Sequence, residues 1–249
     1  QSSAYYKTRS NWILNHYTTL STFGQLTVDS DDSDPEREIV IKKLESALAS
    51  FQKIGDSATT AEIHWAIAEH KFYEERPIKN NFLGNEEYAT HARLAYEYYR
   101  KSNQSWPALQ ILGYEIISNW NTGNNEKVKQ LEVDAANIYL KEPDKKIKAL
   151  DAYHLGILYG QNNRASLGLE YLFNAEELLL DINEKDLLKN VYQSISMVYW
   201  FVNNNEKSLE YAYKDLKLRK ELNFYEGIAQ AYQNIVANLF YLNRIDSIP

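Results

Sequence analysis

The histidines are the first residues to test for metal chemistry. The chain has five histidines, and His64 and His70 are the two that share one predicted helix. They are six residues apart and therefore lie on different faces of that helix, whereas a helical zinc pair uses residues four apart. We expect packed or solvated histidines rather than a metal site, and we expect no cofactor.

The acidic segment 29–38, "DSDDSDPERE", is a candidate calcium loop, because acidic and hydroxyl side chains alternate in it. It lacks the turn glycine and the terminal bidentate glutamate of such loops. The same residues suit the start of a helix: Ser33 or Asp34 as the cap, Pro35 in the first turn, and Glu36 complementing the helix dipole. The sequence therefore favours a helix start over a calcium site.

Motifs for catalysis are missing from the sequence. The absence of cysteine excludes thiol nucleophiles, and the nine glycines are scattered rather than gathered in a phosphate-binding loop. There is no G-x-S-x-G nucleophile elbow. We therefore predict a protein that is not an enzyme.

Charge and hydropathy exclude two further classes. The net charge is −7, with acidic and basic residues interspersed, so the sequence lacks the basic stripe typical of nucleic-acid binding. No apolar run reaches the roughly 18–20 residues that a membrane helix needs. We expect membrane association only through segments outside this sequence.

Helical periodicity appears almost everywhere along the chain. In the segment 205–222, Leu209, Ala212, Tyr213 and Leu216 share one face, while Glu210 and Lys214 form an i,i+4 pair on the other. Short Asn, Gly and Asp clusters separate such segments. The pattern predicts an all-α protein of about eleven helices, at 3–23, 36–54, 58–76, 86–102, 106–120, 124–141, 145–161, 164–181, 185–202, 205–222 and 225–242.

Pairs of these helices repeat with a period near 40 residues, around 156, 196 and 236. The second helix of a pair carries a small residue, Gly168 in one copy and Ser208 in the next, which predicts a close approach of two helices. We expect Tyr211 and Ala212 to fill the seam. One hairpin cannot bury its apolar face alone, so the hairpins are expected to stack.

The segments 155–179, "LGILYGQNNRASLGLEYLFNAEELL", and 195–218, "ISMVYWFVNNNEKSLEYAYKDLKL", resemble the tetratricopeptide repeat (TPR). Residues 112–139 match with three extra residues, and 83–99 match the second half. The departures are a period of 40 instead of about 34 and the lack of the packing proline. HEAT-like hairpins have about 40–47 residues but lack the Leu-Glu-Tyr pattern. The resemblance implies a right-handed α-solenoid of antiparallel helix hairpins.

The repeats divide the sequence into two expected parts. Residues 1–57 are predicted to form a degenerate N-terminal hairpin or cap, and 58–249 to form TPR-like repeats whose last copy is incomplete. A solenoid normally ends on a polar cap. We therefore expect a fragment of a longer protein, with Leu239, Phe240 and Leu242 near an exposed apolar end.

The resemblance places the first helices of each pair along a concave groove. That groove would be rich in amides and aromatic rings, with little charge, which suits a protein or peptide partner first and an oligosaccharide second. The Lys/Asn/Arg clamp of chaperone adaptors is replaced by Tyr, Ile, Gln and Met. The predicted binding residues are Tyr153, His154, Asn190, Gln193, Met197, Trp200, Gln230, Gln233, Asn234 and Tyr241.

The long helices and the ending "YLNRIDSI" resemble the repeat regions of Bacteroidetes-type membrane-bound transcriptional regulators and histidine kinases. That resemblance implies a ligand-sensing domain outside the cytoplasmic membrane, which the lack of cysteine also suits. Two alternatives remain open. One is a cytoplasmic peptide receptor of the quorum-sensing type, and the other is a stand-alone TPR scaffold or adaptor.

Overall fold

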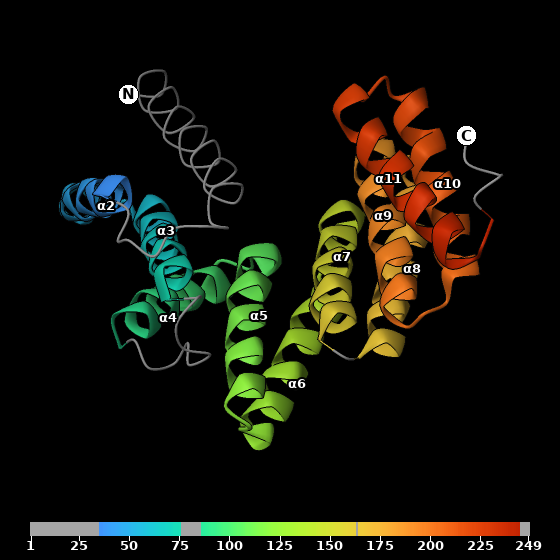
Figure 1. The fold of residues 1–249 in the computed structure, drawn as a ribbon. Helices are drawn as coiled ribbons and strands as arrows, with labels where there is room; N and C mark the ends of the chain where they lie inside the picture. Colours follow the sequence, from blue (N-terminus) through green and yellow to red (C-terminus); the bar gives the residue numbers. More distant parts are fainter. Residues whose placement is uncertain (1–34, 76–85, 163, 245–249) are drawn as a thin grey trace. The chain divides into compact units, whose positions relative to one another are not determined.

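The computed structural model describes residues 35–75, 86–162 and 164–244, and these residues form ten helices and no strand (Figure 1). The all-α repeat architecture is thus confirmed. From 36–54 onward, each predicted helix agrees with the structure to within one residue at either end; the predicted helix 3–23 lies outside the described residues. The helices are α2 (Pro35–Ile54), α3 (Ser57–Glu75), α4 (Glu86–Lys101), α5 (Ser105–Asn121), α6 (Asn125–Lys141), α7 (Lys145–Gln161), α8 (Ala165–Asp181), α9 (Lys185–Phe201), α10 (Asn205–Glu221) and α11 (Tyr225–Tyr241).

From α5 to α11 the chain is built on a step of twenty residues. Each of these helices has 17 residues, and their first residues follow one another as 105, 125, 145 and so on. A three-residue turn joins one helix to the next. The 40-residue period of the sequence is therefore two helix-plus-turn units.

Most of the described turns between these helices contain one residue whose backbone lies in the left-handed region. Asn103, Asn183, Asn203, Asn223 and Asn243 have φ between 53° and 58°, and Gly123 at the same step has φ 74°. Glycine tolerates this conformation because it has no Cβ, and asparagine because its short polar side chain can form local hydrogen bonds. These residues end one helix and turn the chain back on itself.

The turn after α9 shows how the backbone groups are satisfied. The N–H of Asn203 donates to the carbonyl of Trp200 and that of Asn204 to Tyr199, both at 2.9 Å. The side chain of Asn204 then accepts from the N–H of Lys207 at 3.2 Å and caps α10. One short Asn-rich sequence therefore closes one helix and opens the next.

The chain divides into two compact units, residues 1–98 and 99–249. In the first unit, α2 packs on α3 through the buried residues Leu44, Ile63, Ala66 and Ile67. The second unit contains α5 to α11. The predicted boundary after residue 57 stays a prediction.

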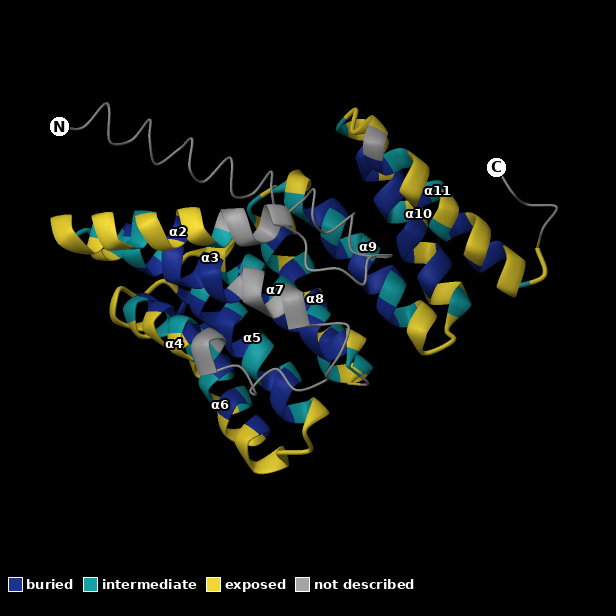
Figure 2. Cartoon of the chain, turned by 60° about the vertical axis from the view of Figure 1, so that its left-hand side comes forward, coloured by how far each residue is buried: buried dark blue, intermediate teal, exposed yellow. Residues whose placement is uncertain are grey.

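Small residues set the spacing within the hairpins of the second unit. A Cβ added to Gly168 of α8 would lie 2.5 Å from the backbone nitrogen of Gly160 in α7. In the next hairpin, the hydroxyl of Ser196 donates to the carbonyl of Ser208 at 2.8 Å. The predicted close approach is confirmed, and buried residues follow the facing sides of the helices (Figure 2).

Burial in α10 and α11 confirms two further residues and corrects the expected end of the array. Tyr211 and Ala212 are buried, as expected. Of the three residues predicted near an exposed apolar end, only Phe240 is exposed, at 61%. Leu239 is buried and Leu242 half-buried, because both face the core shared with α10.

The turn between α6 and α7 breaks the pattern. Its residue at the twenty-residue step is Pro143, whose ring fixes φ near about −65° and forbids the left-handed turn. Glu142 accordingly has an extended backbone, with φ −68° and ψ 116°. Beyond the break, Asp144 caps α7 by accepting from the N–H groups of Lys146 and Ile147. Helix α7 then packs on α5 and α8.

Candidate binding surface on the first helices

The predicted groove residues occupy equivalent positions on α7, α9 and α11. Tyr153, Gln193 and Gln233 follow one another at 40-residue steps, and so do Asn190 and Gln230. These positions recur at the same place on each first helix. We call the face that carries the ten predicted residues the first-helix face.

The first-helix face becomes more exposed toward α11. Gln230, Gln233 and Tyr241 are exposed, and Trp200 is 39% exposed. The other predicted residues are half-buried: Tyr153, His154, Asn190, Gln193, Met197 and Asn234. The carboxamide of Gln230 donates to Asn234 Oδ1 at 3.3 Å, so two of the amides on α11 already face one another.

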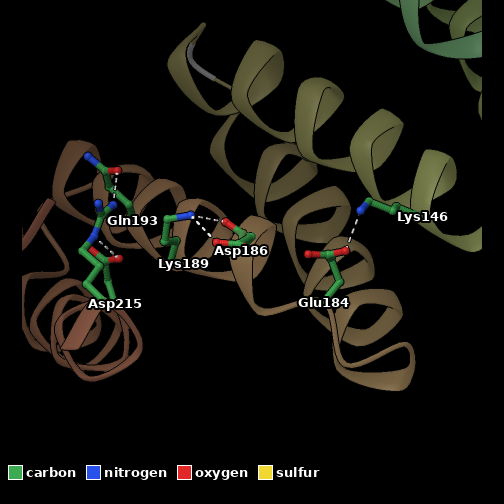
Figure 3. Close-up of polar contacts among 7 residues, drawn as sticks. Lys146, Glu184, Asp186, Lys189, Gln193 and Asp215 are labelled. Atoms are coloured by element: carbon green, nitrogen blue, oxygen red, sulfur yellow. Dashed lines mark hydrogen bonds and ion pairs between the residues drawn. The ribbon is translucent and has the colours of Figure 1, made fainter. Parts of the chain in front are cut away.

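Gln193 belongs to a buried polar cluster between α9 and α10 (Figure 3). Arg219 donates from Nη2 to Gln193 Oε1 at 2.8 Å and from Nε to Asp215 Oδ1 at 2.6 Å. Asp215 is 1% exposed and Arg219 is 4% exposed. Burial raises the pKa of Asp215 to about 6, although the hydrogen bond and charge of Arg219 oppose that rise. A guanidinium thus holds the Gln193 carboxamide in place.

Two residues near the start of α11 make room for Arg219. A Cβ on Gly227 would lie 1.9 Å from Arg219 Nη1, so a larger residue there would force the guanidinium to shift. The ring of Phe224 lies 5.6 Å from the guanidinium carbon, within range of a cation–π contact. In the preceding hairpin, the positions of Asp215 and Arg219 hold Ala175 and Leu179, which are buried apolar residues.

Ion pairs surround the starts of the first helices. On α9, Lys189 donates to the carbonyl of Asp186 at 2.5 Å and lies 3.4 Å from its carboxylate, while Lys146 of α7 contacts Glu184 at 2.6 Å (Figure 3). A second set repeats with the period of 40: Lys145 pairs with Asp181, and Lys185 pairs with Glu221. The pairs of this second set are largely exposed, so each contributes little to stability.

The two predicted residues of α7 face neighbouring helices. Tyr153 lies beside Ser194 and Arg219, and burial raises the pKa of its phenol, opposed by a hydrogen bond with Ser194. The ring of His154 packs edge-on against Trp106, with centroids 5.4 Å apart. Its Nε2 is buried and would meet a Cβ on Gly113 at 2.9 Å.

Burial lowers the pKa of His154 to about 4, although a backbone hydrogen bond at Leu109 opposes this. The imidazole is therefore neutral at pH 7. Tyr153 and His154 both shape the seam between first helices.

An aromatic patch lies at the C-terminal ends of α9 and α11. It consists of Trp200, Phe201, Phe240 and Tyr241, all exposed by more than a third. The Trp200 and Tyr241 ring centroids are 6.3 Å apart across the two helices, in an edge-on arrangement. Asn203 and Asn205 line the same hollow as three of these rings, in a volume of about 280 Å³.

Metal chemistry finds no support in the part of the chain that the structure describes. No group of three or more His, Cys, Asp or Glu gathers there in a way that could hold an ion. Nδ1 of His64 lies 2.9 Å from Nδ1 of His91, and burial together with His91 lowers the pKa of His64 to about 4. Most of the acidic segment 29–38 lies outside the described residues.

No helix in the described part of the chain is long and apolar enough to span a membrane.

Comparison with known proteins identifies the fold. No protein-family model matches the sequence, and no curated protein matches it. Among solved structures, BtubC (BKLC) from P. vanneervenii is similar, with a TM-score of 0.64 and 13% identity over 86% of this chain and 87% of that one.

A second similar structure is a signal transduction ATPase with numerous domains from Pyrococcus horikoshii, described as having a tetratricopeptide repeat sensor. The TM-score is 0.58 and the identity 18%, over 82% of this chain. The match spans 30% of that protein. At these identities the likeness concerns the fold alone: a helical repeat array of the tetratricopeptide kind.

Sequence reasoning missed the residues that organise Gln193. Asp215 and Arg219 lie on a second helix, four residues apart, and read as an ordinary exposed ion pair. One signal could have found them. Aligning the chain on its own 40-residue period places both charges at positions that hold Ala and Leu one period earlier.

Proposed function

We propose that the chain is a non-enzymatic interaction domain whose first-helix face binds an extended peptide. One observation carries the proposal: an uncharged row of amides recurs at equivalent positions of two neighbouring first helices. The row consists of Asn190 and Gln193 on α9, and Gln230, Gln233 and Asn234 on α11.

The chemistry of the row suits a peptide backbone. Each carboxamide has a carbonyl acceptor and two N–H donors, so it can pair with a peptide N–H and a peptide C=O at once. The Arg219 guanidinium holds the oxygen of Gln193, which leaves the NH₂ group of that side chain as the donor. The aromatic patch offers an apolar surface on which a hydrophobic side chain of the same ligand can pack.

A peptide selection tests the proposal. Random peptides displayed on phage are selected on the immobilised chain, and the best binders are titrated by fluorescence anisotropy. The double variant Gln230→Ala/Gln233→Ala removes two exposed amides without touching the core. We expect roughly 5- to 150-fold weaker binding, since a pair of hydrogen bonds contributes about 1–3 kcal/mol.

Gln130→Ala is the matched control, because Gln130 is an exposed amide on the second helix α6. It should bind as the unaltered chain does. Failure to select any peptide, or equal binding by the double variant, would contradict the proposal.

A sensing role outside the cytoplasmic membrane, within a longer bacterial regulator, is the finer form of this proposal. Its support is the repeat sensor described for the similar ATPase and the sequence likeness to membrane-bound regulators. Fractionation of source cells, followed by blotting with an antibody to this chain, tests it. A band well above 29 kDa in the membrane fraction supports the regulator. A cytosolic band supports the peptide receptor or the stand-alone scaffold instead.

An oligosaccharide is the second candidate ligand, and the aromatic patch favours it. Sugar rings stack on exposed aromatic faces, and Asn203 and Asn205 supply amides for hydroxyl groups beside Trp200. Binding to a glycan array that disappears in Trp200→Ala, with peptide binding unchanged, would select this candidate.

A further inference from the structure

The break at Pro143 opens a pocket in the second unit. The end of α4, the start of α5 and the end of α6 surround a cavity of about 390 Å³. This volume lies within the range of small-molecule sites, about 300–1,000 Å³. Six other turns that the structure describes at the twenty-residue step have an Asn or Gly in the left-handed conformation, whereas this one has Pro143.

A buried carboxylate forms one wall of the pocket. Glu142 is 8% exposed; its Oε2 accepts from the Ser105 hydroxyl at 2.6 Å and its Oε1 from the Asp144 N–H at 2.9 Å. Both Glu142 and Ser105 line the cavity. Two hydrogen bonds thus hold a negative charge at a fixed place beside an open space.

A second carboxyl lies behind the first. Asp151 of α7 is completely buried, and neither of its oxygens receives a hydrogen bond. It lies close enough to Ser105 and Glu142 for both to influence its ionisation. Its position holds Ile111 in α5 and Val191 in α9, both completely buried, so the packing of a first helix requires an apolar residue there.

An unpaired buried acid is costly, and a nearby cation removes most of that cost. A positive group in the pocket is therefore attracted toward Glu142, which lines the cavity. Two cationic side chains, Arg100 and Lys141, also lie on the cavity wall, and so do the amides of Asn103, Gln104 and Asn137.

We propose that this pocket binds an α-amino acid. The ammonium group contacts the Glu142 carboxylate, with Asp151 behind it, and the carboxylate of the ligand pairs with Lys141. The wall amides pair with whatever polar atoms the ligand side chain carries. None of these residues belongs to the first-helix face, so the inference goes beyond the proposed function and can fail or succeed separately from it.

The site also has a consequence for the array. A ligand held between the α4–α5 turn and the α6–α7 turn adds contacts at the one described turn of the second unit that lacks the left-handed Asn or Gly. Binding there stabilises one arrangement of α6 and α7. Each repeat of a solenoid contacts only its neighbours, so a ligand that fixes one junction between helices can alter the geometry of the array.

The test is a titration of the full chain with each of the twenty common L-amino acids, by thermal unfolding and by isothermal calorimetry. Any amino acid that binds is compared with its N-acetyl derivative, which lacks the ammonium group. We expect at least one amino acid to raise the unfolding temperature, and its N-acetyl derivative to bind at least tenfold more weakly.

Two charge-neutral variants locate the site. Glu142→Gln keeps the shape of the side chain and should weaken binding at least tenfold, and Asp151→Asn should weaken it by a smaller factor. Glu126→Gln, an exposed carboxylate on α6, is the control and should bind normally. Circular dichroism verifies that each variant is folded. The proposal is overturned if no common amino acid binds, if the N-acetyl derivative binds equally well, or if Glu142→Gln leaves binding unchanged.

Discussion

Replacing Asp151 with valine is expected to stabilise the protein. The position already holds Val191 in the next first helix, where the side chain is completely buried. Valine is apolar and of roughly the size of aspartate, and it removes a carboxyl whose oxygens receive no hydrogen bond. Exchanging buried charged groups for well-packed apolar ones is often stabilising by about 1–4 kcal/mol.

The structure sets the size of the effect. Burial raises the pKa of Asp151 from 3.8 to about 7; the Glu142 carboxylate adds to the rise, while the Ser105 hydroxyl and the Lys148 ammonium oppose it. A tenfold change in proton affinity corresponds to about 1.4 kcal/mol. Ionised Asp151 therefore costs the folded state up to about 4 kcal/mol, and we expect Asp151→Val to gain about 2–4 kcal/mol above pH 7.

The pH dependence has a definite sign. Between pH 4 and pH 7 the folded state holds a proton on Asp151 that the unfolded state has lost, so stability falls as pH rises through this window. Below pH 4 both states are protonated. Asp151→Val removes this contribution, so the difference in stability between variant and parent should grow from pH 4 to pH 7 and then level off.

Urea unfolding followed by circular dichroism at several pH values measures that difference. Asp215, whose pKa is also raised, and His154, whose pKa is lowered, are present in both proteins. Their contributions to the pH dependence therefore cancel when the two stabilities are subtracted. A variant that is less stable than its parent at pH 7, or a difference independent of pH, would refute the reasoning that Asp151 is a buried carboxyl without compensation.

Three further predictions concern the packing and the turns. Gly227→Ala should displace the Arg219 guanidinium and lower the free energy of unfolding by about 1–3 kcal/mol, measured by urea unfolding. Adding Arg219→Leu should not restore stability, because it leaves the buried Asp215 carboxyl without its partner, whereas adding Asp215→Ala as well should restore it. Gly168→Ala places a methyl group against the backbone of α7 and should lower the free energy of unfolding by about 1–3 kcal/mol in the same assay. Asn203→Ala, at φ 58°, should lower the unfolding free energy by about 1 kcal/mol, whereas Asn203→Gly should be neutral or stabilising; equal stability of both variants would contradict a left-handed turn.

The sequence by itself determined the helices. Their limits follow from local chemistry, because six described turns contain an Asn or Gly with a left-handed backbone at the twenty-residue step, and Asn124, Asp144 and Asn204 cap the helices that follow them. The 40-residue period is equally local, and it predicts the close approach that Ser196 and Ser208 make. No residue outside the segment is needed to read these signals.

Only the tertiary structure decided which polar side chains are exposed. Gln193 reads as a groove amide, yet its carbonyl accepts from Arg219, 26 residues further along the chain. His154 likewise reads as a surface residue, but it packs against Trp106 of another helix pair. Partners that are distant in sequence meet only once the hairpins stack, so helical periodicity cannot specify them.

The pocket at Pro143 also combines features visible in the sequence with features that depend on tertiary packing. A proline in place of the turn asparagine is visible in the sequence, and so is an aspartate at a core position. The packing of α5, α6 and α7 decides the rest. It leaves a cavity beside the altered turn, and it brings Glu142 and Asp151 close to the same residue, Ser105. Local preferences fix where each helix begins and ends, whereas burial and charge are properties of the space between helices.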